Sequence, residues 1–206
     1  MPYVELPAFL LELRQLEGIY ARTLEFTILT AARTGEVVGA TWDEIDLKSK
    51  TWTIPANRMK MGREHKIPLS VTALALLRAL PREEGNPFVF IGPKPGKGLS
   101  NMSMFWLLRR MQRADITVHG FRSSFMDWAH DRTAFPKVVI YMALAHSVGD
   151  KVEAAYRRAD LFAKRKQLMQ AWEKYCASRP TTTPAEDNVV VAFLAPEPHI
   201  RLAGSR

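Results

Sequence analysis

The chain has 206 residues, of which 47% are hydrophobic and 24% are charged, and this composition excludes a disordered or fibrous protein. It has no run of about 18 apolar residues, no signal-peptide pattern and only one cysteine, which excludes a membrane-spanning helix, an export signal, a disulfide framework and a cysteine-built zinc site. The missing export signal and the single cysteine predict a cytoplasmic protein. The net charge of +8 resides in residues 1–176, and this basic body predicts a polyanionic partner, DNA or RNA.

The first 40 residues have the periodicity of helices. Apolar residues from Leu6 to Leu13 recur at helical spacing, and Gly18 predicts the end of that helix. Residues 21–32 are more apolar and predict a second helix that is buried on several sides. A short third helix is expected up to Ala40, with Thr34 as its N-cap.

From residue 42 the periodicity changes to that of strands. Segments 42–47, 51–54 and 65–68 predict a small antiparallel meander, with residues 57–64 as its second turn. Ser70 predicts the N-cap of a helix that ends near Leu80, and a loop with a short strand at 88–91 follows. Further helices are expected at about 101–114, 120–131, 137–145, 151–156 and 161–176. The expected fold class is therefore α+β, mostly helical with a three-stranded antiparallel sheet.

We expect a folded domain at residues 1–179 and a flexible tail at residues 180–206. The apolar residues of 161–176 lie mostly on one helical stripe, which must be buried on its own domain or on a neighbouring protomer. Residues 180–188 have the composition of a linker. Residues 189–194 are apolar and prone to form a strand, which predicts exchange with a neighbour or addition to a sheet edge.

Several polar residues lie where the local pattern does not require them. Arg33 ends an apolar helix, Lys60 lies in the predicted hairpin turn, and His119 and Arg122 lie one helical turn apart. His146 follows an apolar run, and ten residues later the chain reaches a tyrosine, Tyr156. Taken singly, each has an ordinary explanation as a helix-end charge, a solvated side chain, a surface pair or a packed ring.

Taken together and in this order, these six residues resemble the active site of the tyrosine recombinases. The intervening text also resembles the catalytic domains of integrases from temperate phages and genomic islands, most closely the P4-like branch, over about residues 6–176. The four strings that carry the resemblance are ARTGEVVGATWDEIDL, RMKMGREHKIPLS, TVHGFRSSFMDWA and LAHSVGDKVEAAYRR. A lone His-x-x-Arg would be uninformative, whereas six positions within four long strings are specific.

The resemblance implies a site-specific DNA recombinase that integrates or excises a prophage or genomic island. Tyr156 would attack the scissile phosphate and form a 3′-phosphotyrosyl intermediate. Arg33 and Arg122 would bind the nonbridging oxygens with their planar, permanently charged forks. Lys60 would protonate the leaving 5′-oxygen as the general acid.

The remaining implied roles are supporting ones. His119 would assist proton transfer at the tyrosine, His146 would donate a hydrogen bond to the phosphate, and Glu36 would orient Arg33. Three further arginines, Arg109, Arg110 and Arg113, are candidates for contacts with the DNA backbone, although a solvated helix face explains them equally well. No metal and no cofactor is implied, because guanidinium and ammonium groups would replace the metal of other nucleases.

The implied partner is double-stranded DNA at attachment sites, bound by a homotetramer of the full-length protein, with accessory excision or DNA-bending proteins, in the bacterial cytoplasm at the nucleoid. Integrases of this kind carry arm-binding and core-binding domains before the catalytic one, whereas this chain starts at the expected first helix of the catalytic domain. We therefore expect a monomer at this length. Two alternatives stay open: a DNA-binding remnant without recombination activity, and strand relaxation like that of a type IB topoisomerase. Trapping a covalent adduct separates the remnant from an active enzyme.

Overall fold

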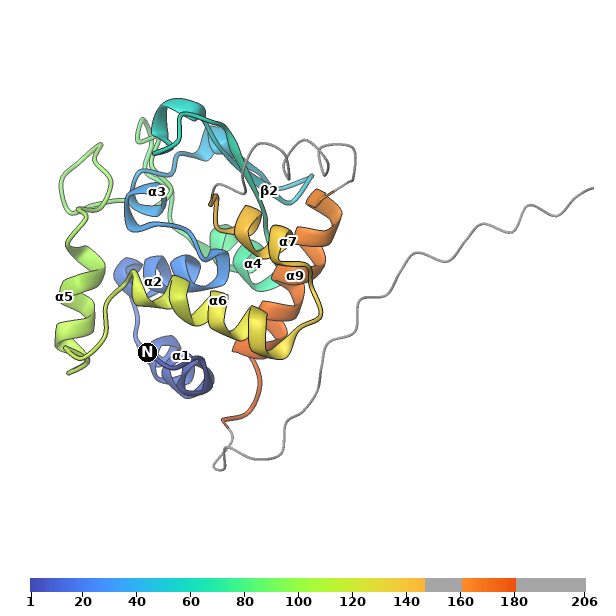
Figure 1. Ribbon diagram of the computed structural model, residues 1–206. Helices are drawn as coiled ribbons and strands as arrows, with labels where there is room; N and C mark the ends of the chain where they lie inside the picture. The colour runs from blue at the N-terminus through green and yellow to red at the C-terminus, as the bar shows by residue number, and fades with distance from the viewer. Residues whose placement is uncertain (147–160, 181–206) are drawn as a thin grey trace, which may run out of the picture.

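The computed structural model describes residues 1–146 and 161–180, and this part of the chain is mostly helical with one small sheet (Figure 1). The predicted α+β fold class is confirmed. The predicted helix at 151–156 and the apolar segment at 189–194 lie outside the described residues. In chain order the elements are η1 (Tyr3–Glu5), α1 (Leu6–Gln15), α2 (Ile19–Thr30), α3 (Thr34–Val38), η2 (Trp42–Glu44), β1 (Ile45–Asp46), β2 (Thr51–Ile54), η3 (Ala56–Arg58), β3 (His65–Pro68), α4 (Val71–Ala79), α5 (Ser103–Arg110), α6 (Gly120–Arg132), α7 (Lys137–Ala143) and α9 (Leu161–Cys176).

The sheet has the predicted antiparallel order β1-β2-β3, but its first strand is shorter than expected. Residues 42–44 form the 3-10 helix η2, which the Glu44 N–H closes by donating to the Thr41 carbonyl. The Glu44 side chain then accepts a hydrogen bond from the Trp52 indole at 2.9 Å, and this tertiary contact overrides the alternating pattern. The strand expected at 88–91 is absent as well, since Phe88 and Ile91 make only isolated bridges.

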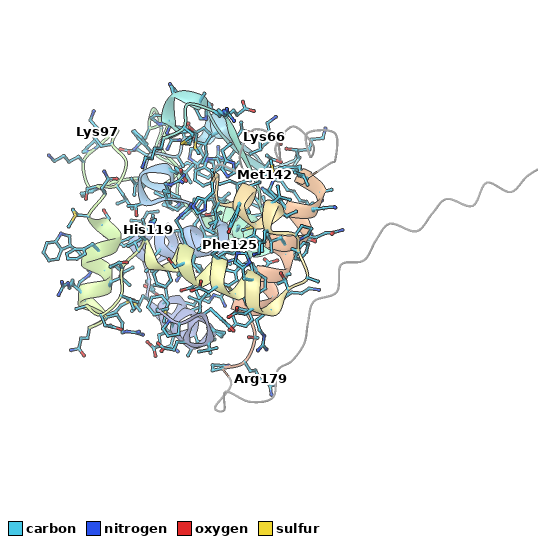
Figure 2. All side chains as sticks on the ribbon, viewed as in Figure 1. Lys66, Lys97, His119, Phe125, Met142 and Arg179 are labelled. Carbon is cyan, nitrogen blue, oxygen red and sulfur yellow. The ribbon has the colours of Figure 1, made fainter. Side chains whose placement is uncertain are left out.

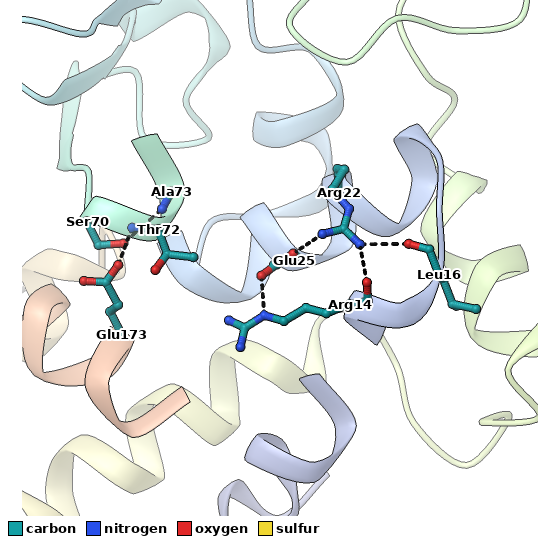
Figure 3. A network of polar contacts seen from close by, with 8 residues as sticks. All are labelled: Arg14, Leu16, Arg22, Glu25, Ser70, Thr72, Ala73 and Glu173. Atoms are coloured by element: carbon teal, nitrogen blue, oxygen red, sulfur yellow. Dashed lines mark hydrogen bonds and ion pairs between the residues drawn. The ribbon is translucent and has the colours of Figure 1, made fainter. Parts of the chain in front are cut away.

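Helix α2 packs against α1, α3, α4, α5 and α9, which confirms that it is buried on several sides. Its buried Thr23, Thr27 and Thr30 donate their hydroxyl groups to carbonyls four residues earlier, so these polar side chains cost little inside the core. The buried Glu25 is paired with Arg14 at 2.7 Å and with Arg22 at 2.9 Å (Figure 3).

Three helices end in a left-handed residue that is not glycine, and this explains why the sequence placed all three of these ends too late. Ala31, Gln112 and Ala145 have φ angles of 50°, 58° and 48°. The residues that follow Gln112 and Ala145 each donate their backbone N–H to a carbonyl five residues earlier. This is the hydrogen bond of a Schellman motif. The helices predicted at 21–32, 101–114 and 137–145 end instead at Thr30, Arg110 and Ala143.

Helix α9 has the predicted bounds and packs on its own domain, against α1, α2, α6, α7 and β3. Trp172 is fully buried among the rings of Phe125, Trp128 and Tyr175, and its indole donates to the Ile28 carbonyl at 2.8 Å. Figure 1 shows α6 crossing between α5 at one side and α9 at the other. The choice left open for residues 161–176 is thus resolved in favour of packing within the chain.

Candidate active site

The turn from α2 into α3 places Arg33 and Glu36 face to face. Arg33 occupies the N-cap of α3, one residue before the predicted Thr34, which corrects the expected cap. The Glu36 carboxylate accepts the Arg33 backbone N–H at 2.8 Å and the Arg33 guanidinium at 2.7 Å. The Glu36 side chain is 6% exposed and that of Arg33 is 27% exposed, so the carboxylate is shielded while part of the guanidinium faces solvent.

Arg122 in α6 is buried between the C-terminal ends of two helices. Its guanidinium donates to the carbonyl of Ala31, after α2, and at 2.7 Å to the carbonyl of Leu144, after α7. Carbonyl groups at helix C-termini carry partial negative charge and stabilise the buried cation. Burial and the charge of Arg33 nevertheless lower the pKa of Arg122 to about 10, while Glu36 opposes that shift, so Arg122 stays protonated at neutral pH.

The two candidate histidines come from neighbouring elements. His119 is exposed at the N-cap of α6, and Figure 2 labels it there. His146 is exposed just after α7, where its backbone N–H donates to the Tyr141 carbonyl at 2.9 Å. Loss of part of its hydration lowers the pKa of His146, and the charges of Arg122, Arg33 and His119 lower it further. Four of the six predicted residues therefore lie close enough to interact electrostatically.

Lys60 lies at the tip of the hairpin between β2 and β3. The Gly62 N–H donates to the Met59 carbonyl at 3.0 Å and closes a turn in which Lys60 is exposed. Its neighbours Met59 and Met61 line a pocket of about 380 Å³ together with His146. The structure thus places the Lys60 turn beside His146, although no contact of the Lys60 ammonium with the candidate arginines is present among the described residues.

Two buried polar residues beneath this pocket were not singled out by the sequence. His65 on β3 is 9% exposed, and it lines the pocket with Arg165 of α9. Arg165 donates to the Lys66 carbonyl at 2.7 Å and so fastens α9 to β3. The signal for Arg165 was its position on the apolar stripe of α9. His65 offered no such signal, because an inward position on a short strand looks the same for any residue.

Burial of His65 predicts a pH-dependent stability. Burial and the nearby Arg165 lower the pKa of His65 to about 4, against opposing contributions from Glu36 and a hydrogen bond with the Ala143 backbone. The unfolded chain binds this proton near pH 6.5. The contribution is therefore complete above pH 6.5 and decreases as the pH falls toward 4, by about 3 kcal/mol.

Urea unfolding of the wild type and of His65→Gln between pH 7.5 and 4.5 measures this effect. The glutamine can keep a hydrogen bond but cannot take up a proton. We expect the free energy of unfolding of His65→Gln to fall less steeply with acidification than that of the wild type. Parallel pH profiles for the two proteins would contradict the assignment of this dependence to His65.

The three candidate arginines for backbone contacts differ in their surroundings. Arg109 and Arg110 are exposed at the end of α5, and their guanidinium groups lie 5.0 Å and 5.6 Å from the ring centroids of Phe105 and Tyr20. Arg113 instead pairs with Asp115 at 3.0 Å and with Glu5 at 3.5 Å. Arg113 would have to exchange these partners to bind a phosphate, so Arg109 and Arg110 are the better candidates.

The tyrosine expected to react, Tyr156, lies outside the described residues. Within residues 1–146 and 161–180, no group of three His, Cys, Asp or Glu side chains is placed to hold a metal ion. The charged groups that do converge are cationic, with Glu36 as their acidic partner. Such an arrangement has the charge to attract an anion, and guanidinium groups match the geometry of a phosphate.

Comparison with known proteins identifies the family of the chain. Residues 5–161 match the sequence profile of the phage integrase family. Prophage integrase IntA of Escherichia coli (strain K12) is 39% identical over 148 residues, which cover 70% of this chain and 36% of the relative. Prophage integrase IntZ of the same organism is 33% identical over 82% of this chain and 43% of its own. The integrase of Enterobacteria phage P4 is 30% identical over 85% and 44%.

The chain belongs to the phage integrase family, whose members are tyrosine recombinases. It spans less than half the length of the curated relatives named above. In the part of the chain that the structure describes, no helix has the length and apolar character needed to cross a membrane.

Proposed function

We propose that this chain is the catalytic domain of a site-specific DNA recombinase, formed by residues 1–179, which cleaves and rejoins DNA strands to integrate or excise a prophage or genomic island. The single observation that carries the proposal is the convergence of Arg33, Arg122, His119 and His146, in which Glu36 holds the Arg33 guanidinium at 2.7 Å and two helix ends hold that of Arg122. The positive charges of Arg33 and Arg122 repel each other, and a bound phosphate offsets that repulsion. Family membership supports the same conclusion.

The proposed reaction exchanges one phosphodiester for another. The Tyr156 oxygen attacks phosphorus, the bond from phosphorus to the 5′-oxygen breaks, and Lys60 gives that oxygen its proton. Arg33 and Arg122 bind the nonbridging oxygens as negative charge increases on them, and His146 adds a hydrogen bond. His119 assists proton transfer at the tyrosine. The reverse attack by a 5′-hydroxyl restores DNA, and the retained phosphate ester makes a separate energy source unnecessary.

Glu36 takes the role of a positioning residue in this proposal. Its two carboxylate oxygens hold the backbone and the guanidinium of Arg33 at once, so they fix the direction in which the guanidinium points. A carboxylate in a different position would not fix this direction. The direction matters because the guanidinium must present a defined edge to the phosphate.

The proposed partner is double-stranded DNA at an attachment site, with assembly into a homotetramer in a protein that carries the additional domains of such integrases. Accessory bending or excision proteins would act at that level. The net charge of +8 supports binding to the phosphate backbone. The tail beyond residue 180 is proposed to contact a neighbouring protomer in that assembly.

The proposed contacts of Arg109 and Arg110 with DNA phosphates predict that DNA affinity falls steeply as the salt concentration rises. If Arg109 and Arg110 each neutralise one phosphate, the negative slope of log K against log salt becomes shallower by about 2 when both are replaced with Gln. This change should be the same for any duplex sequence. Arg113→Gln is the control, and because Arg113 is already paired with Asp115 it should change the slope less. Fluorescence anisotropy with a labelled duplex measures both. An unchanged slope in the double variant would leave α5 as a solvated face.

The proposed function itself is tested by trapping the intermediate. A duplex with a nick close to the cleaved phosphate loses a short strand after cleavage, so the covalent complex cannot revert. The 206-residue chain incubated with such a duplex should give a band that resists detergent and that protease removes. DNA binding without any adduct on matched attachment-site DNA would instead support the DNA-binding remnant.

A further inference from the structure

Arg58 connects three elements around the site and has no place in the reaction described above. It ends the 3-10 helix η3, two residues before Lys60, and its side chain is 22% exposed. One terminal nitrogen of its guanidinium donates to the carboxylate of Glu44, whose side chain is 8% exposed. The other donates to the Glu36 carbonyl at 2.6 Å and lies 3.5 Å from the Gly35 carbonyl.

This arrangement places Arg58 between two candidate catalytic segments. Glu36 binds Arg33 with its side chain and Arg58 with its backbone carbonyl. That carbonyl lies near the end of the short helix α3, where backbone acceptors lack partners within the helix and favour a cation. On the other side, the chain leaves Arg58 directly into the turn that carries Lys60.

The Glu44 carboxylate fixes the other edge of the guanidinium. It also accepts the Trp52 indole N–H at 2.9 Å, and Trp52 is fully buried in β2. The anchor of Arg58 is therefore rigid, because it is attached to the sheet core. A lysine at this position could reach the carboxylate or the carbonyl but could not hold both in a planar fork.

We propose that Arg58 is a positioning residue, which holds the Lys60 turn against the Arg33–Glu36 turn so that the general acid and the phosphate ligand meet at the same phosphate. This inference rests on the proposed function, because it assigns Arg58 to the protonation step. A displacement of about 1 Å in such a group reduces a rate by up to about 10²-fold. The loss must appear in proton donation rather than in phosphate binding.

A substrate with sulfur at the bridging 5′ position isolates that step. Thiolate is a good leaving group and does not need a proton from the enzyme, whereas an alkoxide does. Lys60→Ala should cleave the oxygen substrate slowly and the sulfur substrate at nearly the wild-type rate. Arg58→Lys should reproduce that pattern, with a loss of about 10²-fold on oxygen. Arg33→Ala should be slow on both.

Arg22 provides a matched control for the structural cost of the substitution. One of its terminal nitrogens pairs with the buried Glu25 at 2.9 Å, and the other donates to the carbonyls of Leu16 and Arg14, as Figure 3 shows. Arg22→Lys therefore removes a similar fork at a place that carries none of the proposed catalytic residues. It should lower the melting temperature and leave both cleavage rates unchanged.

Gly39→Ala displaces Arg58 without removing any chemical group. A Cβ atom at Gly39 would lie 2.7 Å from a terminal nitrogen of Arg58, while the φ angle of −93° suits alanine. The variant should show the same preference for the sulfur substrate, with a smaller loss on oxygen. It also keeps the proposal testable if Arg58→Lys does not fold.

The outcomes separate this proposal from the proposed function. A wild-type chain that forms no adduct contradicts the function. If Lys60→Ala is not rescued by sulfur, no acid is present at that turn, and the proposal for Arg58 fails with it. If Lys60→Ala is rescued while Arg58→Lys and Gly39→Ala cleave both substrates equally well or equally slowly, only the role of Arg58 is overturned.

Discussion

Replacing Tyr156 with Phe should abolish the covalent protein–DNA adduct completely, while DNA affinity and the melting temperature stay near those of the wild type. The variant removes a single oxygen atom, which is the proposed nucleophile, and it keeps the aromatic ring. The measurement is the detergent-resistant band formed with the nicked duplex, together with thermal unfolding and anisotropy on the same preparation.

Tyr141 is the appropriate control, because among the described residues it is a tyrosine whose ring lies next to that of His146. Its ring centroid lies 6.2 Å from that of His146, and it belongs to α7. Tyr141→Phe should keep the adduct. An adduct that survives in Tyr156→Phe and disappears in Tyr141→Phe would transfer the nucleophile to Tyr141. Loss in both variants would point to a structural effect rather than to chemistry.

Periodicity predicted the elements whose signal is local. The bounds of α9 agree with the sequence because an amphipathic stripe of 16 residues is long, and strands β2 and β3 agree because turn-like or polar residues separate them. The strand predicted at 42–47 was wrong at its start, where residues 42–44 form η2. Hydrogen bonds from Trp52 and Arg58 to Glu44 hold this segment in place. Those donors lie 8 and 14 residues away, beyond the reach of any local pattern.

The sequence proposes the members of the candidate site but not their geometry. The sequence identified Arg33, Glu36 and Arg122, whereas nothing in it indicated that Arg122 joins two helix ends through backbone carbonyls. Left-handed Ala31, which bears one of those carbonyls, and left-handed Ala145, which follows the other, also carry no sequence signal, because glycine is the usual residue there. The nucleophile remains a prediction from the sequence, since Tyr156 lies outside the described residues.

Arg122→Lys should reduce adduct formation by about 10²–10³-fold, a span typical for the loss of one preorganised donor to a developing charge. Lysine keeps the positive charge but has one nitrogen in place of a planar fork with five N–H groups. It cannot donate to Ala31 and Leu144 and also bind a phosphate edge. The sulfur-bridged substrate should not restore the rate, because phosphate binding rather than protonation is impaired.

The same substitution also weakens the fold, and the two effects must be separated. A buried carbonyl that loses its donor costs about 1–3 kcal/mol, so the melting temperature of Arg122→Lys should fall. Trp172→Phe is the stability control, since it removes the indole donor to the Ile28 carbonyl near the end of the same helix α2. Measured well below both melting temperatures, Trp172→Phe should keep the wild-type rate while Arg122→Lys does not. Equal losses in the two variants would mean that Arg122 acts through stability alone, because no difference would then remain for phosphate binding to explain.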